Sequence, residues 1–329
     1  MKILIAGYGS IGRRHFRNLL NLGVKDILFY STHNSTIEKD EISGFIIEDD
    51  LEDALAHKPD AVIVSNPTSL HLDVAIPAAK AGCHLLIEKP LSHNLDRIEK
   101  LRKFVDQSGS KVLMGFQFRY HPGLHQIKEL LAERKIGKPL SVRVHWGEYL
   151  PYWHPWENHL KGYSARADLG GGVILTLCHP LDYLLWLLGE INSVQAFLGY
   201  SGELGLIAVE DTAEINLRFE SGVIGSVHLN YNQRPPVHDL GIIGTEGTIY
   251  WNGLDGSVKI FRAETGKWNE YFLKENFERN DLFIEEMQHF LDIISTGKTP
   301  ICSLDDGIVI QEIIHYIKQS EKEGKVIKV

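Results

Sequence analysis

The sequence predicts an α/β protein with a doubly wound parallel sheet in its N-terminal part and a second domain of helices and antiparallel strands. Across the first 120 residues, short apolar runs alternate with amphipathic segments, and runs such as 61–64 are apolar throughout, as expected for parallel strands covered on both faces. From residue 121, alternating apolar and polar runs joined by tight turns are typical of antiparallel hairpins. We therefore predict two domains, 1–120 and 121–329, with the last helix packing back on the first domain.

The expected elements follow in the order of the chain. In the first domain we expect strands at 2–6, 26–30, 44–47, 61–64, 84–87 and 111–115, and helices at 11–22, 51–56, 70–81 and 95–107. In the second domain we expect strands at 140–147, 193–198, 212–219, 223–230, 239–243 and 248–251, and helices at 122–134, 172–187, 281–295 and 305–320. An irregular aromatic stretch fills 149–163. Because crossovers between parallel strands are right-handed, the first set of elements forms a doubly wound sheet.

Composition argues against several classes of protein. The 329 residues carry a net charge of −9, whereas binders of nucleic acid or anionic membranes need a basic face. The three scattered cysteines, Cys83, Cys178 and Cys302, fit a reducing cytoplasm and form neither a disulfide framework nor a zinc site. The N-terminal apolar run ends at Gly7, too early for a signal peptide, and no stretch is long and apolar enough to span a bilayer. We expect no metal site.

The turn after the first strand has the spacing of a dinucleotide-binding loop. Gly7, Gly9 and Gly12 form a GxGxxG motif directly after a strand and at the start of an amphipathic helix. The first glycine allows the tight turn, the second lets the backbone approach a pyrophosphate, and the third allows close packing of helix on strand. We therefore expect a Rossmann domain that binds a nicotinamide dinucleotide. The residues expected to bind it here are Gly7, Tyr8, Gly9, Ser10, Ile11 and Gly12.

The end of the second strand bears on which dinucleotide binds. NAD enzymes usually carry Asp or Glu there, where the carboxylate accepts from the ribose 2′-hydroxyl. This chain has Ser31, Thr32 and His33 instead, whose side chains can donate hydrogen bonds to a 2′-phosphate. We therefore predict NAD(P) as the cofactor and favour NADP. Since no arginine accompanies these residues, an NAD enzyme that tolerates serine at this position is the alternative.

Two polar loops follow the fourth and fifth strands, whose carboxyl ends border the ligand crevice of such a sheet. The residues expected to line the cofactor are Asn66, Pro67, Thr68 and His71 in the first loop and Glu88, Lys89 and Pro90 in the second. At this rim the amine of Lys89 can bond the oxygen of a substrate and share its proton. On spacing alone, a solvated surface lysine is the alternative.

These motifs and two further ones occur in order along nearly the whole chain. They are Gly7-x-Gly9-x-x-Gly12, Pro67-Thr68-Ser69-Leu70-His71, Glu88-Lys89-Pro90, Gly170-Gly171-Gly172 with His179-Pro180-Leu181-Asp182, and the closing Asp305-Asp306-Gly307, Ser320 and Gly324-Lys325-Val326. The chain resembles the Gfo/Idh/MocA family, which includes glucose–fructose oxidoreductase and inositol dehydrogenase. The resemblance implies a Rossmann domain plus an α+β domain with a large open, mainly antiparallel sheet. It also implies a tightly bound nicotinamide cofactor and hydride transfer at a carbon of a sugar, cyclitol or sugar nucleotide.

The resemblance further implies two catalytic residues. Lys89 matches the catalytic lysine of the family, and the bond before Pro90 is expected to be cis. The second catalytic element of the family is a helix with Asp and His four residues apart on one face. His179 matches the histidine, but Leu175 stands where the aspartate is expected. We therefore expect His179 to act as acid or base without that partner, the alternative being a structural histidine, and Asp182 either to orient it or to pair within the helix.

Other residues are expected to hold the substrate. Aromatic side chains stack on the C–H faces of sugars, and arginine binds hydroxyl or phosphate groups. The candidates are Arg119, Tyr120, Trp153, Tyr163, Arg166, Thr176 and Asp182. For the aromatic stretch, a packed loop core without a ligand is the alternative.

Two other functions stay open at this point. One is NAD-dependent cleavage of a glycoside through transient oxidation of the sugar. The other is non-catalytic sensing of a ligand, which the presence of both Lys89 and His179 disfavours. A large open sheet leaves one apolar face uncovered, so we expect a homodimer or homotetramer.

Overall fold

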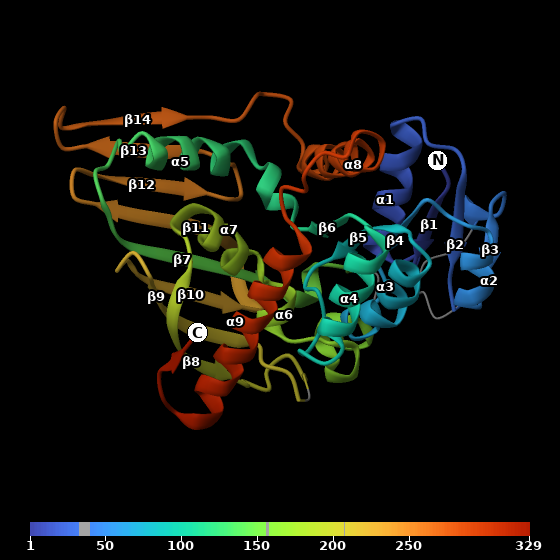
Figure 1. Ribbon diagram of the computed structural model, residues 1–329. Coiled ribbons are helices and arrows are strands. Elements are labelled where there is room, and N and C mark those ends of the chain that lie inside the picture. The colour runs from blue at the N-terminus through green and yellow to red at the C-terminus, as the bar shows by residue number, and fades with distance from the viewer. Residues whose placement is uncertain (33–39, 156–157, 207) are drawn as a thin grey trace. The chain divides into compact units, whose positions relative to one another are not determined.

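The computed structural model describes residues 1–32, 40–155, 158–206 and 208–329, so the predicted cofactor contact His33 lies outside the described residues. The chain divides into two compact units. The first, the parallel-sheet unit, comprises Met1–Gln117 and Arg279–Gln311, and the second, the mixed-sheet unit, comprises Phe118–Glu278 and Glu312–Val329. Each unit is therefore built from two separate stretches of chain (Figure 1).

The parallel-sheet unit has the predicted doubly wound architecture. Its strands are β1 (Ile3–Ala6), β2 (Ile27–Tyr30), β3 (Ile46–Glu48), β4 (Ala61–Val64), β5 (His84–Glu88) and β6 (Val112–Gly115). Its helices are α1 (Ser10–Asn21), α2 (Leu51–Ala56), α3 (His71–Lys80), α4 (Ile98–Ser108) and α8 (Arg279–Thr296), with short 3₁₀ turns at Asp40–Ile42 and Thr68–Leu70. All six strands are parallel, in the order β3-β2-β1-β4-β5-β6. The order reverses between β1 and β4, which is where doubly wound sheets bind ligands.

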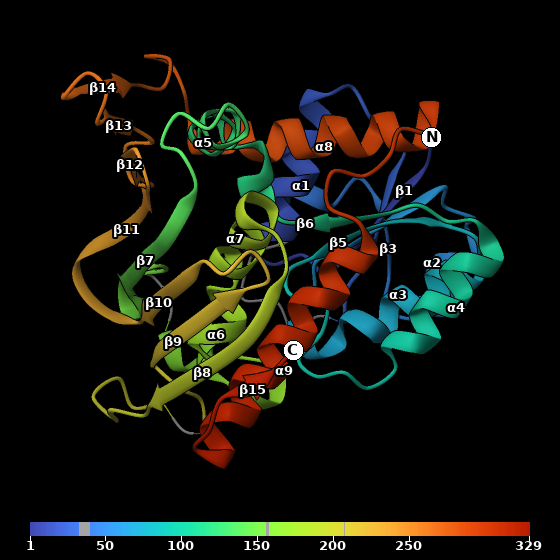
Figure 2. The same cartoon turned by 60° about the vertical axis from the view of Figure 1, so that its left-hand side comes forward.

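Helices cover both faces of this sheet. Helices α1 and α8 lie on one face, and α2, α3 and α4 lie on the other (Figures 1 and 2). Strands β1 and β4 are consequently buried along their whole length, which explains their uniformly apolar sequences. On the side of α8, Met287 and Phe290 join a cluster in which Phe16 packs edge-on against Phe29. A helix from the far end of the chain thus completes the N-terminal core.

One helix of this unit begins later than the sequence predicts. The segment expected to be helical from residue 95 becomes α4 only at Ile98. The side chain of Asn94 accepts a hydrogen bond of 3.0 Å from the backbone N–H of Asp96, and Arg97 adopts a φ of 68°. An asparagine bonded to the backbone two residues on favours a turn over a helix, so the start of α4 is displaced.

The mixed-sheet unit contains a nine-stranded sheet, as the resemblance implied. Its strands are β7 (Pro139–Tyr149), β8 (Ile191–Gly199), β9 (Thr212–Phe219), β10 (Ile224–Asn230), β11 (Asn232–Gly244), β12 (Gly247–Asn252), β13 (Val258–Arg262), β14 (Lys267–Tyr271) and β15 (Ile327–Lys328). Their order is β14-β13-β12-β11-β7-β10-β9-β8-β15. Neighbouring strands are antiparallel except β7 and β10, which are parallel.

The sequence prediction missed three of these strands and shortened a fourth. Every residue of β14 is exposed, and β15 has two residues, so neither shows an alternating apolar pattern. Strand β13 alternates only over five residues. Strand β11 extends back from the predicted 239–243 to Asn232, through two prolines that argue against a strand. A register shift between Asn232 and Val237 accommodates these prolines in the pairing with β7.

The helices of the mixed-sheet unit are α5 (Pro122–Ala132), α6 (Val173–Thr176), α7 (His179–Leu188) and the C-terminal part of α9 (Leu304–Glu323). Short 3₁₀ turns occupy Gln117–Tyr120, Leu150–Tyr152, His159–Lys161, Tyr163–Ala165 and Ala167–Leu169. Figure 2 shows α5, α6 and α7 on one face of the sheet. Along β7, Val142, Val144 and Trp146 are buried on this face, whereas Arg143 points to the opposite face and is exposed.

The single helix predicted from Gly172 to Leu187 is wrong: α6 and α7 are two helices, separated at 177–178 by a bend of 44°. Pro180 explains the break, because it has no N–H to donate to the carbonyl of Thr176 and its ring collides with that turn. No single helix in the described part of the chain is long and apolar enough to cross a membrane; only the bent pair 167–176 and 179–188 has the length and composition.

Candidate functional site

The glycine turn between β1 and α1 is built by close backbone packing. Gly7 has a φ of 97°, and a Cβ there would lie 2.7 Å from the backbone nitrogen of Asn66. A Cβ on Gly12 would lie 2.1 Å from the carbonyl oxygen of Gly7. A Cβ on Gly9, in contrast, would meet nothing within 4 Å. Gly7 and Gly12 are therefore required by the fold, while the backbone of Gly9 is left open at the start of α1.

The N-terminus of α1 is suited to bind a phosphate group. No side chain caps it, and its first turn carries no acidic residue, so its free N–H groups are not neutralised locally. Ser10 is exposed and Ile11 is half-buried beside the open Gly9. This observation, together with the open backbone of Gly9, shows that the turn fits a dinucleotide pyrophosphate.

Tyr8, predicted to contact the cofactor, is instead largely part of the core. It is 1% exposed and packs edge-on against Phe29, and its hydroxyl donates a 3.0 Å hydrogen bond to Glu41. Burial, followed by the hydrogen bond and charge of Glu41, raises the pKa of Tyr8 to about 12. Glu41 also accepts hydrogen bonds from Arg17 and Arg13, which lower the pKa of its carboxyl to about 2. The sequence analysis missed this pair of arginines because Glu41 lies far from α1 along the chain.

The loop after β4 is joined to the loop after β5 by a buried histidine. His71 is 1% exposed; its Nδ1 lies 2.9 Å from the carbonyl oxygen of Pro90, and its Nε2 lies 3.0 Å from that of Asn66. Burial lowers the pKa of His71, against the charge of Glu88 and the two carbonyls. Thr68 is also buried, whereas Asn66 and Pro67 are partly exposed. His71 therefore fixes the shape of the two loops.

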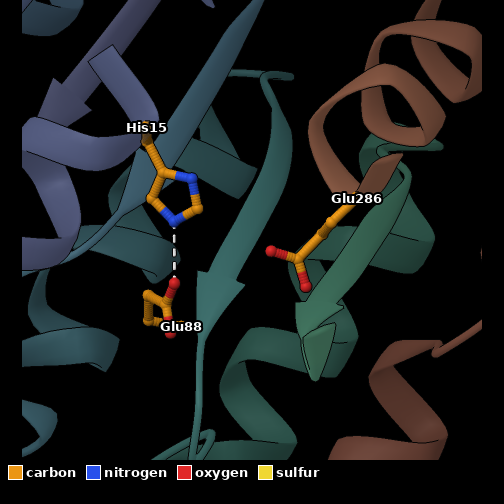
Figure 3. Close-up of side chains that lie close together, drawn as sticks. All are labelled: His15, Glu88 and Glu286. Carbon is orange, nitrogen blue, oxygen red and sulfur yellow. Dashed lines mark hydrogen bonds and ion pairs between the residues drawn. The ribbon is translucent and has the colours of Figure 1, made fainter. Parts of the chain in front are cut away.

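Lys89 is half-buried directly after β5, and the bond between Lys89 and Pro90 is cis, as predicted. The preceding residue, Glu88, is 7% exposed, and its Oε1 lies 2.7 Å from Nε2 of His15 on α1. Its Oε2 accepts a 3.3 Å hydrogen bond from the backbone N–H of Lys89. The carboxyl group of Glu286 on α8 points toward this pair (Figure 3). The sequence analysis expected Glu88 to line the cofactor, and it missed both His15 and Glu286.

In the mixed-sheet unit, His179 begins α7 and lies in a buried cluster of rings. It is 2% exposed, its ring is edge-on to Phe118 at 4.9 Å, and it lies 5.6 Å from the ring of Trp146. His238 stacks on the other side of the cluster, 4.2 Å from Trp146, and accepts or donates a 3.2 Å hydrogen bond with Tyr183. These rings hold the imidazole of His179 in a largely apolar environment.

Leu175, which stands where the family has an aspartate, is buried in α6. Because α6 ends at Thr176 and α7 begins at His179, the two positions do not share one continuous helix. The four-residue spacing that places Asp and His on one helical face therefore does not apply to this chain. Thr176, one of the predicted substrate contacts, is 2% exposed.

Two other predicted substrate contacts, Arg119 and Asp182, are paired with each other. Nε of Arg119 lies 2.9 and 3.1 Å from the two carboxylate oxygens of Asp182, and Nη2 lies 2.8 Å from Oδ1. The side chains are 5% and 0% exposed, and the guanidinium lies 5.5 Å from the ring of Trp186. Asp182 is thus paired with Arg119, from the segment before α5, rather than with a residue of its own helix.

The remaining predicted substrate contacts differ in exposure. Tyr163 and Arg166 are exposed, and Arg166 forms an ion pair with Asp168. Trp153 is half-buried and edge-on to Tyr231, and Tyr120 is 8% exposed.

A buried carboxyl group that the sequence analysis missed lies beside the triple-glycine turn. Glu210 accepts a 3.1 Å hydrogen bond from the backbone N–H of Ile174, and a Cβ on Gly172 would lie 2.4 Å from its Oε1. Burial raises the pKa of Glu210. Gly172, with a φ of 107°, is therefore needed both for its backbone conformation and for this close approach.

Two family models match the chain. Residues 1–116 match "Oxidoreductase family, NAD-binding Rossmann fold", and residues 124–250 match "GFO/IDH/MocA C-terminal domain". The chain belongs to the GFO/IDH/MocA family. It is thus an NAD-dependent oxidoreductase of a family that acts on sugars and cyclitols, and the predicted resemblance is confirmed.

Relatives within the GFO/IDH/MocA family span the whole chain. Myo-inositol 2-dehydrogenase of Thermotoga maritima is 26% identical, covering 100% of this chain and 98% of the relative. D-xylose 1-dehydrogenase (NADP(+)) 2 of Haloferax volcanii is 24% identical over 82% of this chain and 80% of the relative. A structure of levoglucosan dehydrogenase in complex with NADH and levoglucosan has a TM-score of 0.88 at 20% identity, covering 100% of this chain and 99% of that one. This last similarity supports the fold.

Proposed function

We propose that this protein is an NAD(P)-dependent dehydrogenase that transfers a hydride to or from a carbinol carbon of a sugar, cyclitol or sugar nucleotide. The observation that carries the proposal is the position of Lys89. It is a half-buried amine at the carboxyl end of β5, in a loop that His71 ties to the loop after β4. The loop after β4 borders the point where the strand order reverses, where ligands of doubly wound sheets bind, and β5 is the next strand along the sheet.

The residues of the parallel-sheet unit would hold the dinucleotide as follows. The glycine turn and the N-terminus of α1 would bind the pyrophosphate. Ser31 and Thr32 would face the adenosine ribose, and the loops of Asn66 and Lys89 would border the nicotinamide. When bound, the nicotinamide ring supplies the acceptor or donor of the hydride.

Charge near the start of α1 supports a preference for NADP. Arg13 and Arg17 both bind the carboxylate of Glu41, so these three described side chains together carry one net positive charge. The family relatives named above include an NADP(+) enzyme, so the fold accepts the phosphorylated cofactor. No arginine accompanies Ser31 and Thr32 in the sequence, which argues against NADP. Arg13, which directly follows Gly12, is our candidate for the positive charge that such an arginine would supply.

Lys89 and His179 would divide the work on the substrate oxygen. Lys89 would donate a hydrogen bond to the hydroxyl or carbonyl oxygen and stabilise the charge that develops there. His179 would take or return the hydroxyl proton. The rings of Phe118 and Trp146 pack against His179, which is 2% exposed, and fix the orientation of its imidazole, as catalysis by positioning requires.

The remaining substrate contacts would come from two kinds of residue. Tyr163, Arg166 and Trp153 have surface available for stacking on a sugar or for binding its polar groups. Arg119 and Asp182 would act indirectly, because their buried ion pair joins the segment before α5 to the first turn of α7, which begins with His179.

The test begins with mass spectrometry of any dinucleotide that co-purifies with the protein. Absorbance of the reduced nicotinamide is then followed with a panel of cyclitols, aldoses, anhydrosugars and sugar nucleotides. We expect Lys89→Ala to retain dinucleotide binding and to lose roughly 10²–10⁴-fold in kcat. Lys80→Ala, at an exposed site on α3, is the control. Near-normal turnover by Lys89→Ala would remove Lys89 from the mechanism.

The same panel separates the other two functions. Cleavage of a glycoside with no net reduction of the cofactor would indicate the transient-oxidation reaction. Binding of a sugar with neither reduction nor cleavage would indicate a sensor.

We also propose that a second copy of the chain covers the exposed face of the mixed sheet. This face carries Ile224, Ile243 and Tyr250, which are 52%, 48% and 49% exposed, beside a hollow of about 730 Å³. Large side chains of this kind, gathered on one face, are typical of an interface between subunits.

A further inference from the structure

The parallel-sheet unit contains a buried group of three titratable side chains that the proposed reaction does not use. His15 from α1, Glu88 from β5 and Glu286 from α8 have ligand atoms that all lie within 4.8 Å of one another. His15 and Glu286 are 0% exposed, and Glu88 is 7% exposed. Figure 3 shows the carboxyl group of Glu286 directed at the bonded pair of His15 and Glu88.

The two carboxyl groups have unequal surroundings. Both oxygens of Glu88 accept hydrogen bonds, Oε1 from His15 and Oε2 from the backbone N–H of Lys89. Neither oxygen of Glu286 has a hydrogen-bond partner among the described residues. A buried carboxylate without partners is strongly disfavoured, whereas a neutral carboxylic acid is tolerated. The proton of the pair therefore belongs on Glu286.

The charges around the group agree with this assignment. Burial raises the pKa of Glu88, but the hydrogen bond and charge of His15 and the charges of Lys89 and His71 outweigh it, so the pKa is lowered overall. Glu286 faces only Glu88 among these groups, and burial, followed by the charge of Glu88, raises its pKa well above the ordinary value. Arg14 on α1 adds a further positive charge near Glu88.

We propose that Glu286 is a neutral carboxylic acid beside the carboxylate of Glu88, that it keeps a second negative charge away from this carboxylate, and that it so acts as a positioning residue for Lys89. Glu88 accepts a hydrogen bond from the backbone N–H of Lys89, His15 binds Glu88, and α8 brings the carboxyl group of Glu286 to this pair from the distant end of the chain. The proposal rests on the catalytic role proposed for Lys89. It adds residues of α1 and α8 to the proposed site around the loop after β5.

The sign of the pH dependence follows from the raised pKa of Glu286. An acid whose pKa is raised by folding stabilises the protein at low pH, and this contribution is lost as the pH rises toward the raised value. At high pH, ionisation of Glu286 places a second negative charge beside Glu88 and disturbs Lys89. Stability should therefore decrease as the pH rises from the ordinary value of 4.5 toward the raised pKa, and turnover should fall as Glu286 ionises.

The test uses three variants of the full chain. Glu286→Gln keeps the size and neutrality of the acid, Glu286→Leu removes its hydrogen-bonding groups, and Glu285→Gln is a control at the exposed neighbouring position. Infrared spectroscopy at neutral pH should show the C=O stretch of a protonated carboxyl group that shifts in D₂O. We expect a component of this band that is present in the wild type and in Glu285→Gln and absent from Glu286→Gln; any component from Glu210, whose pKa burial also raises, is the same in all three.

Turnover supplies the second readout. Glu286→Leu should lower kcat by about 10–100-fold with little change in dinucleotide affinity. Glu286→Gln should restore most of kcat and should not lower the melting temperature, and the loss of activity that ionisation of Glu286 causes with rising pH should disappear. If Glu286→Leu does not fold, the infrared band and the pH profile of Glu286→Gln still test whether Glu286 is a neutral acid that positions Lys89.

Four results would overturn the proposal: no protonated carboxyl band assigned to Glu286, a lower melting temperature for Glu286→Gln, a loss of kcat as large for Glu286→Gln as for Glu286→Leu, or a divalent cation that the purified protein retains stoichiometrically and Glu286→Gln lacks. The infrared result needs no turnover. Its outcome therefore does not depend on the turnover of Lys89→Ala, which tests the proposed function.

Discussion

Replacing Arg119 with methionine would remove the guanidinium that binds the buried carboxylate of Asp182. The guanidinium contacts both carboxylate oxygens at 2.8–3.1 Å, and the two side chains are 5% and 0% exposed, so solvent cannot take over the lost interaction. Removing one member of such a pair costs about 3–5 kcal/mol. For a domain of this size, that corresponds to a fall of roughly 6–20 °C in melting temperature.

Thermal unfolding followed by circular dichroism measures this effect, with the double variant Arg119→Met/Asp182→Leu as the matched comparison. Removal of both charges from a buried site is often neutral or stabilising, so the double variant should recover most of the loss. A loss of less than about 1 kcal/mol in Arg119→Met, combined with a raised KM, would refute the reasoning. It would show that Arg119 binds substrate directly and that its pairing with Asp182 carries little stability.

Four further predictions test other parts of the molecule. Gly12→Ala should destabilise the protein by about 1–3 kcal/mol in thermal unfolding, because the added Cβ would lie 2.1 Å from a carbonyl oxygen. In contrast, Gly9→Ala should leave the melting temperature unchanged but weaken dinucleotide binding, as measured by fluorescence titration. Arg13→Ala should weaken binding of NADP+ more than that of NAD+; equal losses would contradict the NADP preference. Burial raises the pKa of Glu210, so stability should fall as the pH rises above the ordinary value of 4.5, and Glu210→Gln should flatten that slope in denaturant titrations at several pH values. Ile243→Glu should dissociate the oligomer in light scattering coupled to size exclusion; an unchanged mass would place the interface elsewhere.

Local patterns in the sequence predicted the parts of this protein whose structure depends on near neighbours. The apolar runs of β1 and β4 and the glycine turn that follows β1 could be anticipated from local patterns, and the family resemblance, carried by short motifs, implied the cis bond between Lys89 and Pro90 in the loop after β5. Each depends on short-range sterics or on a motif contained in a few residues.

Only the tertiary structure determined the remaining features, because each of them depends on contacts between residues that are distant along the chain. Strand β14 has no apolar alternation and exists through its pairing with β13. Arg119 looked like a substrate contact until the fold placed Asp182 against it, and Glu286 lies on α8 with no motif to mark it. Hydrogen bonds and desolvation act over a few ångströms of space, whatever the separation in sequence, so the partners of a buried charge become known only when the chain is folded.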